Sequence, residues 1–129
     1  MPILGINGAG RVTNIGLAEN GKILAEADAE LGRLQSGQLP LMVADLYKQA
    51  GREIGETTLA ALGTGPGYYT AIRTGIAYGA AFASALGIKA VPISSLLIAA
   101  WRYREEFDVV AAVFKARADA VYATIYKGG

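Results

Sequence analysis

A glycine-rich turn between a predicted strand and a predicted helix carries the residues best suited to bind an anion. The segment GPGYYTAIR follows an apolar run that ends at Gly63. Glycine permits positive φ and proline fixes its own φ, so the turn is both tight and specified. The first amides of the following helix lack partners and carry the positive end of its dipole. The candidate anion-binding residues are Gly65, Pro66, Gly67, Thr70 and Arg73.

Packing is the alternative explanation of this turn, because strand-to-helix turns are often glycine-rich simply to be tight. The segment lacks the lysine followed by serine or threonine of a Walker loop. It also lacks the spacing of the dinucleotide-binding fingerprint. A structural role and a role at an interface therefore stay open beside the ligand role.

Small residues recur every four positions along the helix predicted over residues 70–86. A glycine inside a helix costs about 1 kcal/mol relative to alanine, so the close approach of another backbone is the expected compensation. That backbone could belong to the chain's own sheet or to a second chain. The candidate interface residues, on this helix and on the one predicted over residues 36–50, are Leu39, Met42, Leu46, Gly75, Gly79 and Ala83.

The composition excludes several kinds of catalysis. The chain has no cysteine and no histidine, which removes disulfides, thiol catalysis, nucleophile–histidine pairs and zinc sites built on these ligands. No two carboxylates are placed by the sequence in one site, so no catalytic or metal-binding residue is predicted. The formal net charge of +1, with no run of like charge, does not favour direct binding of nucleic acid.

The sequence predicts neither a signal peptide nor a membrane span. The opening MPILGINGAG lacks a basic head and a cleavage site. The longest apolar region has 15 residues between Arg73 and Lys89, short of the roughly 20 needed to cross a bilayer. We therefore expect a soluble cytoplasmic protein with no membrane partner.

Apolar periodicity and turn residues predict an α/β fold. Asn20-Gly21 is a strong hairpin signal, Gly51 and Gly87 are expected to end helices, and Ser94 and Ser95 suit a helix start. The predicted strands are 3–8, 11–20, 22–30, 57–65, 88–93, 108–116 and 119–126, and the predicted helices are 36–50, 70–86 and 94–106. This order predicts a mixed sheet with flanking helices.

The central segment resembles the signature of the TsaB family, also called YeaZ, which usually reads like GPGSFTGLRIG followed by a small-residue helix and a serine-serine-leucine turn. FKARADAVYATIY resembles the strand pair that follows in this family, and residues 3–24 have the outline of its opening hairpin. The matching residues are Gly65, Pro66, Gly67, Thr70, Arg73, Gly75, Ser94, Ser95, Leu96, Ala116, Arg117, Val121 and Tyr122.

The resemblance implies an actin-like, ribonuclease H-like fold, of the kind shared by sugar kinases and heat-shock ATPases. It implies that residues 1–100 form the first lobe and that residues 101–129 open a truncated second lobe. It also implies a non-catalytic partner of a TsaD-type subunit. Together with a TsaE-type ATPase, such a pair helps to install threonylcarbamoyl on a tRNA adenosine. This chain would also pair with itself and meet tRNA only indirectly. ATP or ADP and metal would be held by the partner, and no cofactor by this chain alone.

Some positions depart from the family pattern. An acidic residue usual in the first strand is missing around Asn7, and carboxylates usual near the last strand pair are replaced by Lys115 and Ala120. The alternative function is a phosphotransferase or nucleotide hydrolase of the same superfamily that uses the glycine turn. That function needs a metal-binding carboxylate, which the sequence does not place. These relatives also carry the label of glycoprotein peptidase. The sequence offers no nucleophile–base pair for that activity.

Overall fold

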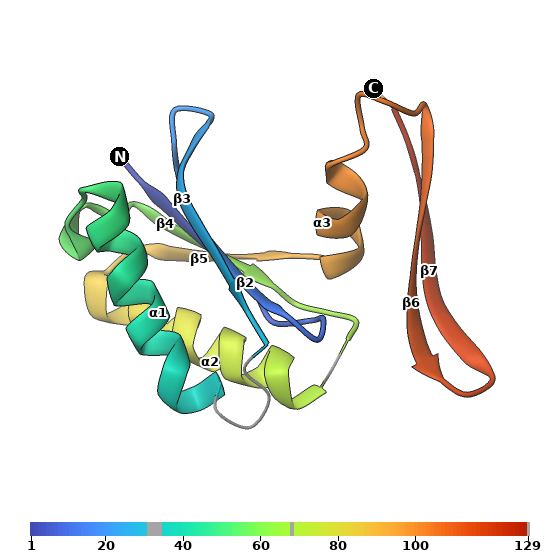
Figure 1. The fold of residues 1–129 in the computed structure, drawn as a ribbon, viewed down its shortest axis with the longest axis horizontal. Helices are drawn as coiled ribbons and strands as arrows, with labels where there is room; N and C mark the ends of the chain where they lie inside the picture. Colours follow the sequence, from blue (N-terminus) through green and yellow to red (C-terminus); the bar gives the residue numbers. More distant parts are fainter. Residues whose placement is uncertain (31–34, 68, 129) are drawn as a thin grey trace.

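A five-stranded mixed sheet forms the larger part of the molecule. Our computed structural model describes residues 1–30, 35–67 and 69–128 (Figure 1). The strand order is β3-β2-β1-β4-β5, in which the first three strands are antiparallel and β4 and β5 run parallel to β1. The strands are β1 (Ile3–Asn7), β2 (Thr13–Glu19), β3 (Lys22–Ala29), β4 (Leu59–Gly63) and β5 (Lys89–Ile93).

The opening hairpin forms where the sequence predicts it. Asn20 and Gly21 both have positive φ, 52° and 77°, which is the conformation that a tight two-residue hairpin turn requires. The register pairs Glu19 with Lys22 on either side of this turn. The pattern of alternating residues and the turn chemistry therefore agree, and the predicted β-β-β opening is confirmed.

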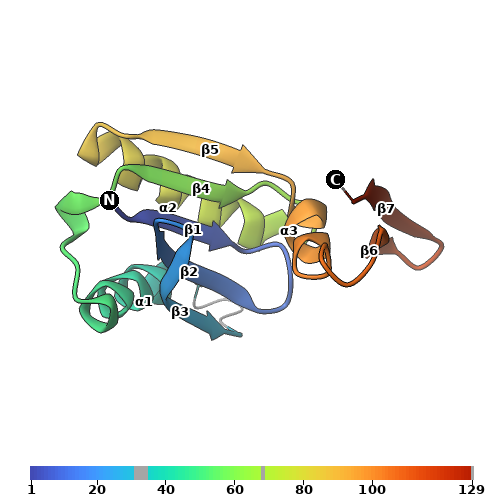
Figure 2. The ribbon, with the colours of Figure 1, turned by 90° about the horizontal axis from the view of Figure 1, so that it is seen from above.

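Two long helices cover one face of this sheet (Figure 1, Figure 2). They are α1 (Gln35–Ala50) and α2 (Tyr69–Leu86), and a short 3-10 turn, η2 (Ile54–Glu56), lies between α1 and β4. Each long helix is followed by a glycine in the left-handed region, Gly51 at φ 66° and Gly87 at φ 67°. Among the helices that the structure describes, none combines the length and the hydropathy needed to cross a membrane.

The core lies between the sheet and these two helices. The fully buried residues of α1 are Leu39, Val43 and Leu46, with Tyr47 beside them, and their spacing is that of one helix face. Leu41, on the same helix, is 59% exposed and lies outside the stripe. The strand residues of the core are Leu4, Ile6, Ile15, Leu17, Ala60 and Leu62.

The last helix is shorter than predicted. α3 spans Ser95–Trp101 rather than residues 94–106, and turns follow it. Every residue from Trp101 to Val109 is exposed, so no apolar contact would hold further helical turns. The stability of a short helix depends on its packing, and this packing ends at Ala100.

A two-stranded antiparallel sheet follows, made of β6 (Val109–Arg117) and β7 (Ala120–Lys127). Leu96 and Ala100 of α3 pack with Ala112 of β6 in a small second core. Figure 2 shows β6 between α3 and β7, so that β7 is the outermost strand. The predicted final strand pair is confirmed, and it forms a sheet of its own.

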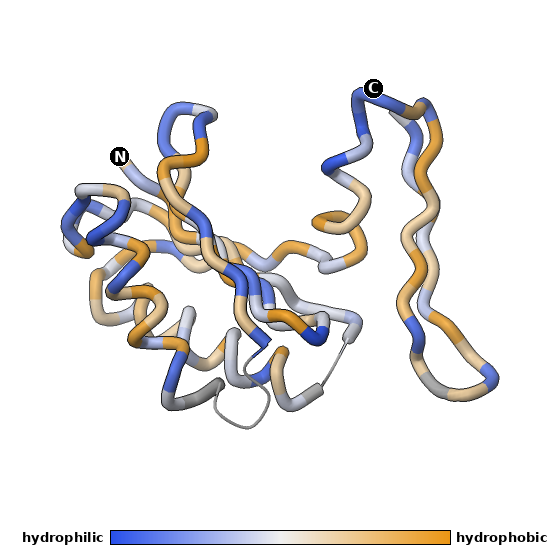
Figure 3. Tube along the Cα trace, viewed as in Figure 1, coloured by the Kyte–Doolittle hydropathy of each residue, from blue (hydrophilic) through white to orange (hydrophobic). Residues whose placement is uncertain are grey.

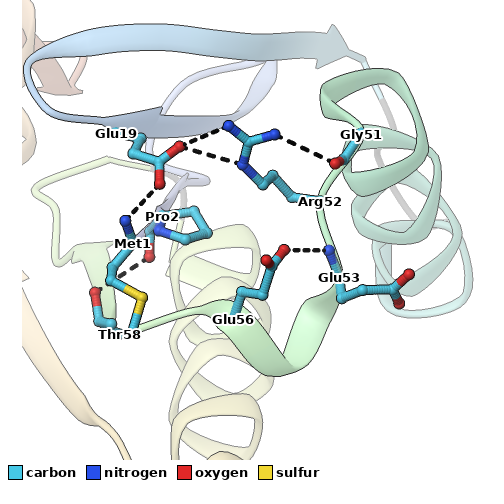
Figure 4. Close-up of polar contacts among 8 residues, drawn as sticks. All are labelled: Met1, Pro2, Glu19, Gly51, Arg52, Glu53, Glu56 and Thr58. Carbon is cyan, nitrogen blue, oxygen red and sulfur yellow. Dashed lines mark hydrogen bonds and ion pairs between the residues drawn. The ribbon is translucent and has the colours of Figure 1, made fainter.

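A polar cluster joins the opening hairpin to the segment after α1 (Figure 4). The Glu19 carboxylate accepts hydrogen bonds from the amino group of Met1 and from Arg52, the latter at 2.9 Å to Nη2. These two positive groups lower the pKa of Glu19. Thr58 N–H donates to the Pro2 carbonyl at 3.0 Å in the same region. The cluster lies at the end of the sheet opposite the glycine turn.

Candidate functional site: the glycine turn and its neighbours

The glycine turn lies where the ends of β1 and β4 meet the starts of α2 and α3. β1 and β4 are parallel neighbours, so Asn7 and Gly63 lie side by side at the ends of their strands. Gly65 has φ 96°, a conformation that other residues rarely adopt, and the Gly65-Pro66 peptide is cis. The sequence therefore needs glycine here for the shape of the turn.

A buried hydrogen-bond network ties this turn to α3. The Ser95 hydroxyl accepts from the Gly65 amide at 3.0 Å and donates to Asn7 Oδ1 at 3.0 Å. The Ser95 amide donates in turn to the Gly65 carbonyl at 2.9 Å. Because Ser95 is fully buried, these bonds satisfy polar groups that water cannot reach.

The expected capping role of the two serines is wrong. Ser94 is the N-cap residue of α3, but its side chain makes no capping hydrogen bond. The Ser95 hydroxyl instead turns to the glycine turn. A buried amide without a partner would be costly, so this bond has more effect than one at an exposed helix end.

Asn7 occupies the position at which the family resemblance leads us to expect a carboxylate. Its Oδ1 accepts from Ser95 and, at 3.4 Å, from the Ala9 amide. A Cβ placed on Gly63 would collide with this side chain, so the two residues are in close contact. Asn7 thus serves as a neutral acceptor within the fold.

Close packing also explains the second glycine of the turn. A Cβ on Gly67 would collide with the Ala9 carbonyl in the connection between β1 and β2. A Cβ on Gly65 would come within 2.9 Å of Ile72 Cδ1. Both glycines are therefore required by contacts inside the chain, which favours the packing alternative. Tyr68, the next residue, lies outside the described part of the chain.

The predicted anion-binding residues do not gather around one hollow. Thr70 and Arg73 are exposed in the first turns of α2, where with Thr74 and Ala77 they line a surface depression of about 300 Å³. Gly65 is buried in the network described above. The exposed side chain of Arg73 and the buried amide of Gly65 therefore lie in different surroundings.

The six predicted interface residues lie against the chain's own sheet. Leu39, Leu46 and Ala83 belong to the main core, and Met42 packs against it. A Cβ on Gly79 would collide with the Leu62 side chain. One on Gly75 would lie 3.5 Å from Ile6 Cγ2. These small residues let α2 approach β1 and β4, so a partner on this helix would have to contact other positions.

A cavity of about 770 Å³ lies between the glycine turn and the hairpin. Sequence reasoning missed it, because its walls come from segments that no local pattern connects. Among the lining residues that the structure describes, Lys115 alone has a charged side chain. The lining residues are Ala9, Gly10, Gly67, Val113, Phe114, Lys115, Ala116 and Tyr122. In the part of the chain that the structure describes, no three acidic or metal-binding side chains are grouped as a metal site would require.

Comparison with known proteins identifies the family. The model of the family described as TsaD, tRNA N6-adenosine threonylcarbamoyltransferase, matches residues 29–129. The chain belongs to this family. No curated protein sequence matches this TsaD-family chain.

The solved structures that are similar to this chain include YeaZ. YeaZ from Pseudomonas aeruginosa superposes with a TM-score of 0.88 at 30% identity, covering 98% of this chain and 60% of that one. An uncharacterized protein with similarity to peptidase YEAZ, also from Pseudomonas aeruginosa, gives 0.89 and 30%, covering 98% and 59%. The chain therefore spans about 60% of the length of the YeaZ structure. The TsaB/YeaZ-like character predicted from the sequence is confirmed.

A more distant structure bears on the fold alone. The ROK hexokinase from Thermus thermophilus matches with a TM-score of 0.57 at 15% identity, covering all of this chain and 48% of that one. Together with the YeaZ matches, this likeness confirms the predicted actin-like fold for the TsaD-family chain.

Proposed function

We propose that this chain is a TsaB-type accessory subunit that acts with a TsaD-type subunit in threonylcarbamoyl modification of a tRNA adenosine. The observation that carries the proposal is the engagement of the glycine turn by the chain itself. The polar groups of Gly65, Ser95 and Asn7 hydrogen-bond to one another, and Gly67 packs on Ala9. A turn engaged in this way positions α2 rather than a substrate.

The outward face of α2 is the surface on which we propose that the partner docks. Arg73, Ala77, Ala81 and Ser84 are exposed there and follow helical spacing. Small side chains let a second helix approach closely, and Arg73 adds one charged contact. The exposed side of α1 extends this surface. The same face would serve for pairing with a second copy of the chain.

The other parts of the proposal follow from this arrangement. The TsaD-type subunit would hold ATP or ADP and the metal, the TsaE-type ATPase would join through the complex, and tRNA would be met indirectly. Residues 1–100 would form the first lobe and residues 101–129 the start of a second. The separation of the two sheets, between Ile93 and Val109, supports this division.

Co-purification tests the partner directly. The chain is co-expressed with the TsaD-type subunit of the same organism, as wild type and as the double variant Ala77→Glu/Ala81→Glu. Two carboxylates buried at a helix–helix contact would abolish co-purification, because burying an unpaired charge is costly. Ala118→Glu, at an exposed alanine in the hairpin turn, is the matched control and should co-purify normally. If the wild type and its partner migrate separately across a range of concentrations, the proposal fails.

Nucleotide binding is the second candidate, and the cavity of about 770 Å³ favours it. Its size suits a small-molecule ligand, and Lys115 could contact a phosphate group. Calorimetric titration of the chain with magnesium and ATP tests this function. Saturable binding that Lys115→Ala weakens would favour the nucleotide role over the accessory role, and a flat titration would exclude it.

A further inference from the structure

Two Asn-Gly pairs make the chain a candidate for spontaneous modification of asparagine. They are Asn7-Gly8 at the end of β1 and Asn20-Gly21 in the turn between β2 and β3. Glycine after asparagine favours the reaction, because it has no side chain to hinder attack by its own backbone nitrogen. The two pairs are equivalent in sequence, so the structure decides which of them reacts.

The structure holds the Asn7 side chain in place. Its Oδ1 accepts hydrogen bonds from the Ser95 hydroxyl at 3.0 Å and from the Ala9 amide at 3.4 Å. Gly8 is buried, and a Cβ on Gly63 would collide with the Asn7 side chain, so this side chain has little room to turn. Rotation of Asn7 toward the Gly8 nitrogen would break both hydrogen bonds and leave buried groups without a partner.

Asn20 and Gly21 lie in open surroundings. Both residues are exposed, and Figure 3 shows that the tip of this hairpin is hydrophilic. A Cβ placed on Gly21 would meet no atom within 4 Å, so the space around its amide is free. The strands pair up to Glu19 and Lys22 on either side of the turn. Opening of the two turn residues alone therefore brings the reacting groups together, at the low cost typical of a loop tip.

We propose that Asn20 is a site of spontaneous deamidation, and that the fold protects Asn7 from the same reaction. The Gly21 backbone nitrogen attacks Asn20 Cγ and forms the C–N bond that closes a five-membered succinimide. The side-chain amide leaves as ammonia, which carries away the proton of the Gly21 nitrogen. One water molecule then opens the ring. Cleavage of the bond to Cγ gives aspartate, and cleavage of the bond to the backbone carbonyl carbon gives isoaspartate.

The two products differ in their effect on the hairpin. Aspartate adds a negative charge but keeps the backbone, and Asp-Gly suits the same tight turn. Isoaspartate also adds one carbon atom to the backbone, because the chain then runs through Cβ and Cγ. A two-residue turn fixes the register of its strands, so the longer backbone should disturb the pairing of Glu19 with Lys22.

The polar cluster at this end of the sheet would transmit the change (Figure 4). Glu19, the residue before the site, accepts hydrogen bonds from the Met1 amino group and from Arg52. Arg52 follows α1, so Glu19 links the hairpin to this helix. Displacement of Glu19 by the isoaspartyl turn would weaken this link. The modification should thus loosen the hairpin as the protein ages.

Mass spectrometry of aged wild type tests the choice of site. The chain is incubated in warm, mildly alkaline buffer, once folded and once in denaturant. Trypsin separates the two sites, because residues 1–11 contain Asn7 and residues 12–22 contain Asn20. We expect Asn20 to react at least about tenfold faster than Asn7 in the folded chain, because breaking the hydrogen bonds of Asn7 raises its barrier. In denaturant the two rates should be nearly equal.

Two variants serve as matched controls, because Gly-Gly and Asp-Gly both suit this turn. Asn20→Gly removes the amide and should leave its position unmodified. Freshly purified Asn20→Asp reproduces the charge of the aspartyl product and should melt close to the wild type. The isoaspartyl form is separated by ion exchange and identified with an isoaspartate-specific methyltransferase. It should melt several degrees below Asn20→Asp. The difference should shrink in a Glu19→Gln background, where the link to Arg52 is already weakened.

Two results would overturn the proposal. The first is a folded chain in which Asn20 reacts no faster than Asn7, since the contacts of Asn7 would then give no protection. The second is an isoaspartyl form that melts at the same temperature as Asn20→Asp, since the hairpin would then tolerate the longer backbone.

Discussion

At the scale of single residues, the buried serine at the start of α3 has the largest structural consequence. Its hydroxyl joins the glycine turn to the end of β1 through Gly65 and Asn7. The residue belongs to a turn motif of the TsaB/YeaZ resemblance. In this chain, the contacts of the motif are internal, so the motif positions the elements around it.

Removal of this hydroxyl should destabilise the fold. Ser95→Ala leaves the Gly65 amide without its acceptor in a buried place, and we expect a loss of about 1–3 kcal/mol in the free energy of unfolding. Ser94→Ala, whose side chain makes no capping bond, is the matched control and should change stability by less than about 0.5 kcal/mol. Denaturant titration measures both variants. Equal effects would contradict the assigned role of Ser95.

Gly79 is a second residue whose substitution should clearly lower the stability of the fold. A leucine there would collide with Leu62 of β4, so Gly79→Leu should lower the free energy of unfolding by about 1–3 kcal/mol or more. Ala80→Leu, the exposed neighbour on the same helix, should leave the melting temperature nearly unchanged. An unchanged melting temperature for Gly79→Leu would show that α2 does not need this close approach.

Glu19 should make stability depend on pH at the acid side. Its pKa is lowered by the Met1 amino group and by Arg52, so folding is favoured above the ordinary carboxyl pKa of about 4.3. This contribution is lost as the pH falls through the lowered pKa, because the folded state then takes up the proton. Glu19→Gln should reduce the acid dependence, measured as melting temperature from pH 7 down to pH 3. Parallel curves for variant and wild type would contradict this role.

At the scale of elements, the connection after α3 is the most accessible part of the chain between the two sheets. Residues 101–109 are all exposed, and Arg104 lies with its guanidinium 4.4 Å from the centre of the Trp101 ring. This segment makes no core contact, so local opening there should cost little.

Trypsin should therefore cut this connection first. We expect early cleavage after Arg102 and Arg104, followed by a persistent fragment that contains the five-stranded sheet with α1 and α2. Mass spectrometry of a time course identifies the sites. First cuts after Lys22 or Arg73, both exposed but on ordered elements, would contradict the proposed division between residues 100 and 101.

At the scale of the whole molecule, two sheets of different size meet near the glycine turn. The larger sheet carries the helices proposed to bind the partner, and the smaller one presents β7 at its outer edge (Figure 2). The cavity of about 770 Å³ lies between them. The likeness to YeaZ extends over both sheets.

Local sequence patterns determined the elements of this fold. Turn chemistry at Asn20-Gly21, glycine ends at Gly51 and Gly87, and apolar periodicity predicted the strands and the α-helices to within a few residues, except the end of α3, while the short η2 was not predicted. These signals act between residues close in the chain, so they can be read without knowing the fold. The family motif added the actin-like topology.

The tertiary structure decided what the residues of these elements contact. From the sequence alone, Leu39 and Gly79 could face either a partner or the chain's own sheet. Only the packing of α1 and α2 shows that they face the sheet. Ser95 and Gly65 are far apart in the sequence, so no local pattern could indicate their hydrogen bond. The direction of a side chain depends on how the elements pack, and packing depends on contacts that span the whole chain.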